Sequence, residues 1–305
     1  MFRIIVVASF FLFPYPALSS EWPTYRGSLS RAGWTAEALA TPLHLQWTHT
    51  APSQPQQAWP GPGGKTIEEL HLRHRVRFDD VFDVIIVDGN VYYGSSVENC
   101  VESVDLRTGQ RRWRFYADGP VRLAPMHANG RLYFGSDDGH AYCLDIETGS
   151  LIWKRRAGPR DERILARGRM SSRWPVRTGV LVDGGIAYFG AGTFPHETVY
   201  ICAVQAENGE VIWCNDAVSQ QDAGRNDLSP QGHLLATDDL LFVSSGRTLP
   251  AAFDRKTGEF VHKQLDGGKQ IGGSSALLID NLLYTIGEHE IVVLDQKTGE
   301  HKYRL

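Results

Sequence analysis

One unit of sequence recurs along this chain and limits the folds that the chain can adopt. Residues 89–113 return as residues 130–153, with their turns 40 residues apart, and a third copy occupies residues 184–213. Two further copies contain the turns that end at Gly258 and Gly299. Four of the five turns have the sequence D-x-x-T-G. Repeats of about 40 residues indicate one small structural unit that is used several times.

Each copy predicts short strands joined by tight turns. The segments that begin at Val91, Leu132 and Ala187 alternate apolar side chains with period two, which is typical of strands. The Asp and Thr oxygens of the turn can accept backbone N–H groups, and the Gly supplies a positive φ. The aromatic residue four positions after the Gly falls on the outer strand, where it can pack against the neighbouring unit. The residues expected to dock the units are Asp105, Thr108, Gly109, Trp113, Asp145, Thr148, Gly149, Trp153, Gly209, Trp213, Asp254, Gly258, Asp295 and Gly299.

A sheet of four strands cannot bury both of its faces alone, but sheets packed face to face around an axis can. We therefore predict an all-β fold, a β-propeller of four-stranded blades. A helical solenoid is disfavoured because the apolar period is two. About five full units are present, with one further outer-strand aromatic, Trp47, before them, so we expect an incomplete or open ring. His262 and Tyr303 replace the Trp in the last two units, where we expect weaker contacts.

The D-x-x-T-G-x-x-x-W unit resembles the tryptophan-docking repeat of the pyrroloquinoline quinone (PQQ) propellers. That family includes quinoprotein alcohol dehydrogenases and the non-catalytic propeller of the bacterial outer-membrane assembly machinery. The segment Trp22-Pro-Thr-Tyr-Arg-Gly27, followed by Arg31 and Gly33, looks like the leader that precedes such repeats in secreted bacterial proteins. The resemblance covers nearly all of the chain after its N-terminal segment. It implies the fold and says little about the activity.

The N-terminus predicts export. An apolar run from Ile4 to Phe13 is followed by Pro-Tyr-Pro and small residues, which indicates a signal peptide over residues 1–19 and a propeller domain over residues 20–305. The rival interpretation, a membrane anchor, is disfavoured because a spanning helix needs about 20 apolar residues. The first 99 residues contain no Cys for lipid attachment. We expect a periplasmic or extracellular protein without a transmembrane segment.

The net charge of −4 provides no overall field to attract nucleic acid, and we expect no nucleic-acid partner. The four cysteines, Cys100, Cys143, Cys202 and Cys214, do not have the spacing of a zinc or haem site. Export would permit a disulfide. Cys202 and Cys214 flank one hairpin, but regular pairing around Asn208-Gly209 sets Cys202 opposite Trp213. We therefore expect no bond between these two cysteines.

The third copy departs from the repeat. The interval from Gly149 to Gly209 is 60 residues, and the excess lies within residues 157–178 and 193–198. In an up-and-down blade these loops emerge on one side, and the D-x-x-T-G turns on the other. We predict a ligand-binding set on that side made of Arg173, Arg177, His196, Glu197, Gln231 and Arg247.

Guanidinium groups match carboxylate geometry, so this set suits an anionic ligand. As surface groups, Arg173 and Arg177 should be replaceable by Ala with loss of acidic-glycan binding and little change in melting temperature. The alternative is that these arginines are solvated or paired with nearby acids such as Asp161, Glu162 and Glu197. His196 alone is better explained as a structural hydrogen-bonding group than as a base.

No catalytic residue and no metal ligand can be assigned by motif. G-x-S-x-G and G-x-x-x-x-G-K-[ST] are absent, and so are the adjacent cysteines expected in the quinone enzymes. The leading hypothesis is a secreted, non-catalytic propeller that binds a protein or an anionic polysaccharide and needs no cofactor. One alternative is a PQQ-dependent dehydrogenase with PQQ and calcium, and another is a polysaccharide-acting enzyme.

Overall fold

The computed structural model of the chain describes residues 21–38, 41–59, 66–67, 70–71, 78–166, 168–218, 228–246, 248–263, 274–286 and 290–305. These residues form strands joined by turns, with two short 3₁₀ helices, η1 (Tyr25–Gly27) and η2 (Pro195–Glu197). Among the residues described, no helix is long and apolar enough to cross a membrane. The predicted signal peptide, residues 1–19, lies outside the described residues.

Five four-stranded antiparallel sheets, here called blades 1 to 5, follow one another along the chain. Blade 1 is β3 (Val84–Val87), β4 (Asn90–Ser95), β5 (Cys100–Asp105) and β6 (Arg111–Tyr116); blade 2 is β7 (Met126–Ala128), β8 (Arg131–Gly135), β9 (His140–Asp145) and β10 (Leu151–Arg156). Blade 3 is β13 (Leu181–Asp183), β14 (Ile186–Ala191), β15 (Tyr200–Gln205) and β16 (Val211–Asn215); blade 4 is β17 (Leu235–Ala236), β18 (Leu240–Val243), β19 (Ala251–Asp254) and β20 (Phe260–Lys263). Blade 5 is β21 (Ala276–Ile279), β22 (Leu282–Ile286), β23 (Ile291–Asp295) and β24 (His301–Arg304).

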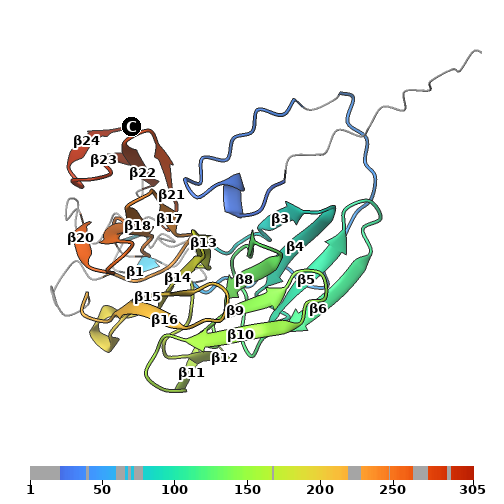
Figure 1. The fold of residues 1–305 in the computed structure, drawn as a ribbon, viewed down its shortest axis with the longest axis horizontal. Coiled ribbons are helices and arrows are strands. Elements are labelled where there is room, and N and C mark those ends of the chain that lie inside the picture. The colour runs from blue at the N-terminus through green and yellow to red at the C-terminus, as the bar shows by residue number, and fades with distance from the viewer. Residues whose placement is uncertain are drawn as a thin grey trace, which may run out of the picture.

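The blades are arranged around an arc, with blade 1 and blade 5 at its two ends (Figure 1). Within every blade the strand order in the sheet is the chain order, so each blade is a simple meander. The remaining described strands form two two-stranded hairpins outside the blades: β1 (Thr66–Ile67) with β2 (Leu70–His71), and β11 (Arg163–Ala166) with β12 (Arg169–Ser172). The predicted all-β propeller of four-stranded blades is confirmed.

The hydrophobic core lies between neighbouring blades. Because side chains alternate across a strand, Leu132 and Phe134 of β8 pack with blade 1, whereas Tyr133 between them packs with blade 3. Phe134 is fully buried and stacks on Tyr142 of the same blade with ring centroids 4.9 Å apart. Similar clusters lie between blades 3 and 4 and between blades 4 and 5. Each inner blade therefore buries both of its faces.

The outer-strand aromatics dock on the turn of the following blade. Trp153 of β10 donates its indole N–H to Ala206 O at 3.0 Å, and its ring lies against Gly209. Gly209 has φ of 74°, and a Cβ there would lie 2.9 Å from the indole, so the turn needs glycine for both reasons. The same hydrogen bond joins Trp47 to Leu106 O, Trp113 to Ile146 O, Trp213 to Arg255 O and His262 to Gln296 O.

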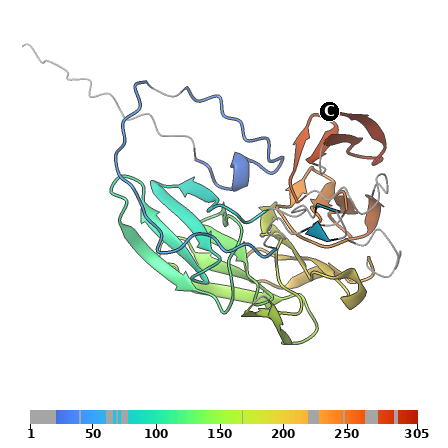
Figure 2. The ribbon, with the colours of Figure 1, turned by 180° about the vertical axis from the view of Figure 1, so that it is seen from behind.

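The leader, residues 21–33, connects the inner strands of four blades. Trp22 exchanges two backbone hydrogen bonds with Ile86 of β3, at 2.8 and 2.9 Å. The carbonyl of Pro23 accepts from blade 2, that of Leu29 from blade 4 and that of Ser30 from blade 5. Figure 2 shows the leader between the two ends of the arc. Arg31, 2% exposed, donates its Nε–H to Leu234 O at 2.9 Å and so fixes the end of this segment.

His233 holds the leader from the side of blade 4. Its ring lies parallel to Tyr25 with centroids 3.7 Å apart, and its Nε2 is 3.7 Å from Asp83 Oδ2. Burial lowers the pKa of His233 to about 4, although Asp83 opposes the shift; the charge of Arg31 adds to the lowering. The imidazole is therefore neutral in the folded protein near pH 7.

The structure contains a disulfide between Cys202 and Cys214, so the prediction of no bond was wrong. Cys202 pairs directly with Cys214, with Cα atoms 4.1 Å apart, and Ala203 pairs with Trp213. The next pair joins Val204 to Val211, so Ile212 is an extra residue in the outer strand. This β-bulge shifts the register by one, and all five blades have the same irregularity before the docking aromatic. Cys100 and Cys143 are buried free thiols.

Replacing Trp153 by Ala should reduce the free energy of unfolding by about 3 to 5 kcal/mol, because a buried aromatic side chain and its hydrogen bond are lost. The matched control is Trp34→Ala, since Trp34 is 77% exposed and its removal should change stability little. Urea unfolding followed by circular dichroism measures both. Equal losses in the two variants would contradict the docking role of Trp153.

Stability should decrease between about pH 6.5 and pH 4, because an unfolded His binds a proton near pH 6.5 whereas folded His233 binds one only near 4. The contribution of neutral His233 to the free energy of unfolding is fully present above pH 6.5, and about 2 to 3 kcal/mol of it should be lost by pH 4.5. The measurement is the unfolding free energy of the parent and of His233→Asn at several pH values. The variant should lose less on acidification, and an unchanged pH dependence would contradict the assignment.

Candidate functional site

Loops of the third copy and of its neighbours gather on one side of the propeller, here called the loop face. In each meander, the turn between second and third strands emerges on the same side as the link to the next blade. The β11–β12 hairpin lies in the link from blade 2 to blade 3, and η2 lies between β14 and β15. Both segments of excess sequence are therefore on the loop face, opposite the D-x-x-T-G turns.

Asp137, in the turn after β8, is the centre of the buried charges on this face. Arg177 donates Nε–H and Nη2–H to the two carboxylate oxygens of Asp137, both at 2.8 Å. Arg122 donates Nε–H to Asp137 Oδ2 at 2.8 Å and Nη1–H to Asp79 Oδ2 at 2.6 Å. Burial alone would raise the pKa of Asp137, but Arg177 and Arg122 outweigh it and hold the pKa below its usual value. Asp137 is thus a fixed anion that joins the turn of blade 2 to two links.

Trp59 covers this group of charges. Its indole N–H donates to Gln231 Oε1, and the Arg177 guanidinium lies 5.6 Å from its ring centroid. Gln231 is 2% exposed and donates its amide to Ser229 Oγ at 2.7 Å. Trp59 is not among the residues predicted from the sequence to bind a ligand or to dock the blades. The sequence did contain a signal for a separate role, because Trp59 does not lie four positions after a turn glycine as the docking tryptophans do.

A second set of charges surrounds Arg173. Its Nη1 lies 2.6 Å from Glu162 Oε1 and its Nη2 lies 3.1 Å from Glu197 Oε1. Hydrogen bonds from Arg173 and then Arg160 lower the pKa of Glu162. The indole of Trp174 donates to Glu197 O at 3.1 Å. Arg173 therefore ties the start of the β11–β12 hairpin to η2.

The six residues predicted as one ligand-binding set fall into separate groups. Arg177 and Gln231 meet around Trp59, and Arg173 meets Glu197. His196 is exposed, with its ring 5.6 Å from that of Phe194. Arg247 lies outside the described residues. The expectation that Arg177 is a surface group was wrong, because it is 5% exposed and bound by both oxygens of Asp137.

A cavity of about 50 Å³ lies beneath Trp59. Three arginines border it, and Arg169 is the one that extends from the β11–β12 hairpin. Arg169 donates Nη1–H to Ser96 O at 2.6 Å and to Val97 O at 3.2 Å. The lining residues are Gln56, Gln57, Ala58, Trp59, Pro120, Arg122, Asp137, Ala166, Arg169, Met170, Ser171 and Arg177.

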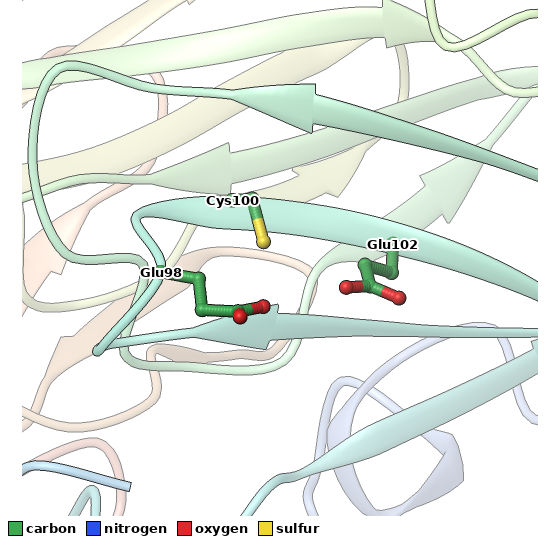
Figure 3. A group of neighbouring side chains, drawn as sticks. All are labelled: Glu98, Cys100 and Glu102. Atoms are coloured by element: carbon green, nitrogen blue, oxygen red, sulfur yellow. The ribbon is translucent and has the colours of Figure 1, made fainter. Parts of the chain in front are cut away.

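A cluster at the start of β5 has the residue types of a metal site. The Cys100 sulfur and the Glu98 and Glu102 carboxylates point toward a common space, within 4.8 Å of one another (Figure 3). Arg114 neutralises the negative charge of this cluster, because its Nη2 contacts Glu102 and lies 3.1 Å from Glu98. Burial, then Glu102, raises the pKa of the Cys100 thiol to about 12. A neutral thiol and an arginine suit an ion-pair cluster better than a cation site.

Comparison with known proteins gives two kinds of relative. Residues 168–304 match the family model described as outer membrane protein assembly factor BamB. The quinone alcohol dehydrogenase subunit of Gluconacetobacter polyoxogenes is 27% identical over 143 residues, which cover 42% of this chain and 18% of that protein. Tetrathionate hydrolase of Acidithiobacillus ferrooxidans is 24% identical over 202 residues, covering 61% of this chain and 36% of that protein. This chain thus spans well under half the length of these curated relatives.

Solved structures agree on the fold. BamB from Moraxella catarrhalis aligns with a TM-score of 0.54 and 16% identity, over 74% of this chain and 62% of that one. Quinohemoprotein alcohol dehydrogenase from Comamonas testosteroni aligns with a TM-score of 0.61 and 14% identity, over 93% of this chain and 49% of that one. The resemblance to the PQQ-repeat propellers is confirmed.

Replacing Arg177 by Ala should lower the free energy of unfolding by about 3 to 5 kcal/mol, because it leaves the Asp137 charge buried with one partner fewer. Arg163→Ala is the matched control, since Arg163 is exposed on β11 and lies 3.6 Å from an exposed Asp161. The control should unfold at nearly the parental urea concentration. An Arg177→Ala protein as stable as that control would show that the Asp137 pair does not support the fold.

Proposed function

We propose that this chain, whose repeats are those of the PQQ-type β-propellers, is an exported scaffold that binds a protein or an anionic glycan with its loop face. The observation that carries the proposal is the pairing of the loop-face acids. Asp137, Glu162 and Glu197 each accept from arginine, while the β11–β12 hairpin and Trp59 elaborate the surface around them. Rigid scaffolds commonly present binding residues on such loops.

The electrostatics favour binding over acid–base chemistry at these residues. A general base or acid works best with a pKa near the operating pH. Arginine contacts hold the pKa values of Asp137 and Glu162 below their usual range instead. These carboxylates fix the arginines in place and do not exchange protons near neutral pH. At Asp137 and Glu162 this weighs against the polysaccharide-acting alternative, which would need one carboxyl group to keep its proton. Asp79, the other partner of Arg122, differs, because burial raises its pKa.

The described part of the loop face does not fit a quinone cofactor. A pocket for a drug-sized ligand is about 300 to 1,000 Å³. The cavity beneath Trp59 is about 50 Å³, and its residues Arg122 and Arg177 are already bound to Asp137. The Glu98–Cys100–Glu102 cluster is a poor calcium site, since calcium takes six to eight oxygen ligands. The dehydrogenase alternative would need a site built from other residues.

Export is part of the proposal. The Cys202–Cys214 disulfide supports it, because such bonds persist in oxidising compartments and are rare in the cytosol. The match to the family model described as outer membrane protein assembly factor BamB supports export and a protein partner.

Calorimetric titration tests the binding proposal. We expect the purified protein to bind poly-L-glutamate or polygalacturonate saturably, with affinity that decreases as NaCl rises from about 50 to about 500 mM. Neutral dextran, the control, should not bind. In parallel, PQQ with Ca²⁺ should neither bind nor support dye-linked alcohol oxidation. Saturable quinone binding with turnover, or no binding of either anionic polymer, would overturn the proposal.

A further inference from the structure

Arg169 is the unmatched charge of the cavity beneath Trp59. Arg122 and Arg177 are both held by Asp137, and Arg122 also by Asp79. Arg169 contacts only carbonyl oxygens through its Nη1, and no carboxylate among the described residues lies within ion-pair distance of it. Three guanidinium groups thus face two carboxylates, which leaves one positive charge beside the cavity.

The buried surroundings strengthen the attraction of this positive charge for an anion. Asp137 is 1% exposed and Arg177 is 5% exposed, so water screens the cavity walls only weakly. Both oxygens of Asp137 are already occupied by arginine N–H groups, which limits its repulsion of an incoming anion. The complement of this site is one negative charge with hydrogen-bond acceptors.

The volume of the cavity limits the size of the ligand group that can enter it. At about 50 Å³, the cavity limits its occupant to a small group of atoms. A planar carboxylate matches the guanidinium fork of Arg169 and meets this limit. A sugar ring that carries its carboxylate directly brings more bulk to the mouth of the cavity, whereas an Asp or Glu side chain brings the carboxylate on a narrow stem.

One part of the cavity rim, formed by the β11–β12 hairpin, is apolar. Met170 lines it and is 51% exposed, and Leu165, which pairs with Met170 across the hairpin, is 74% exposed. Exposed apolar side chains beside an anion site favour a partner whose acidic residue has apolar neighbours. We infer that the loop face binds a protein partner by inserting one Asp or Glu carboxylate of an apolar segment beneath Trp59, with Arg169 as its anchor. This inference rests on the proposed function and narrows its ligand class.

The probe is the peptide acetyl-Ala-Leu-Glu-Leu-Ala-amide, compared with its Gln counterpart at constant ionic strength by calorimetry or by NMR titration. The parent should bind the Glu peptide at least about tenfold more tightly, which is about 1.4 kcal/mol, the scale of a charge-assisted hydrogen bond. Arg169→Gln should remove this preference. Arg169→Lys keeps the charge without the fork and should retain only part of it. Arg163→Gln, on the other strand of the hairpin, should bind as the parent does.

The parental melting temperature of Arg169→Gln is the folding control. An undiminished Glu preference in that variant, or no binding of the Glu peptide to the parent, would overturn the inference. Tighter binding of digalacturonate or inorganic phosphate than of the Glu peptide would also overturn it, because the site would then take another anion. If Arg169→Gln still bound poly-L-glutamate or polygalacturonate normally, this inference would fail while the proposed function would stand.

Discussion

The structure depends on the packing of an indole ring on the turn glycine of the next blade. A single four-stranded sheet leaves both faces in water, so a blade is stable only together with its neighbours. The contact of Trp113 with Gly149 recurs as Trp153 with Gly209, each with a hydrogen bond to a turn carbonyl. His262 replaces the Trp in blade 4 and still reaches Gln296 O. The docking geometry therefore tolerates another ring that carries an N–H donor.

This packing creates a rigid base for the loop face. Asp137 joins a turn of blade 2 to the links that carry Arg122 and Arg177, and Arg31 fixes the leader to Leu234 beside blade 4. Groups that are distant in sequence consequently keep fixed distances. Because their charges are largely compensated within the protein, the described part of the face offers one localised positive charge and not a broad basic field. A charge that is localised in this way suits a specific contact.

The relatives show why the fold alone does not define the activity. The same blades occur in proteins described as an assembly factor and as quinone dehydrogenases. The difference between such proteins lies in loops and in the chemistry of the cavity. In this chain the cavity is small and Trp59 covers it, and the arginines are held by Asp137, which favours recognition of a small group presented by a partner.

The sequence by itself determined the four-stranded blades and the docking aromatics, because both follow from a local spacing of turn glycine and aromatic residue that recurs in the copies. It also located the extra segments of the third copy on one face. Only the tertiary structure decided that Cys214 opposes Cys202, since a single bulged residue, Ile212, changes the register without altering the motif. It alone buried Arg177 against Asp137 and placed Trp59 on Gln231, 172 residues away. Such partners are chosen by the three-dimensional packing of the blades, which no local pattern of residues encodes.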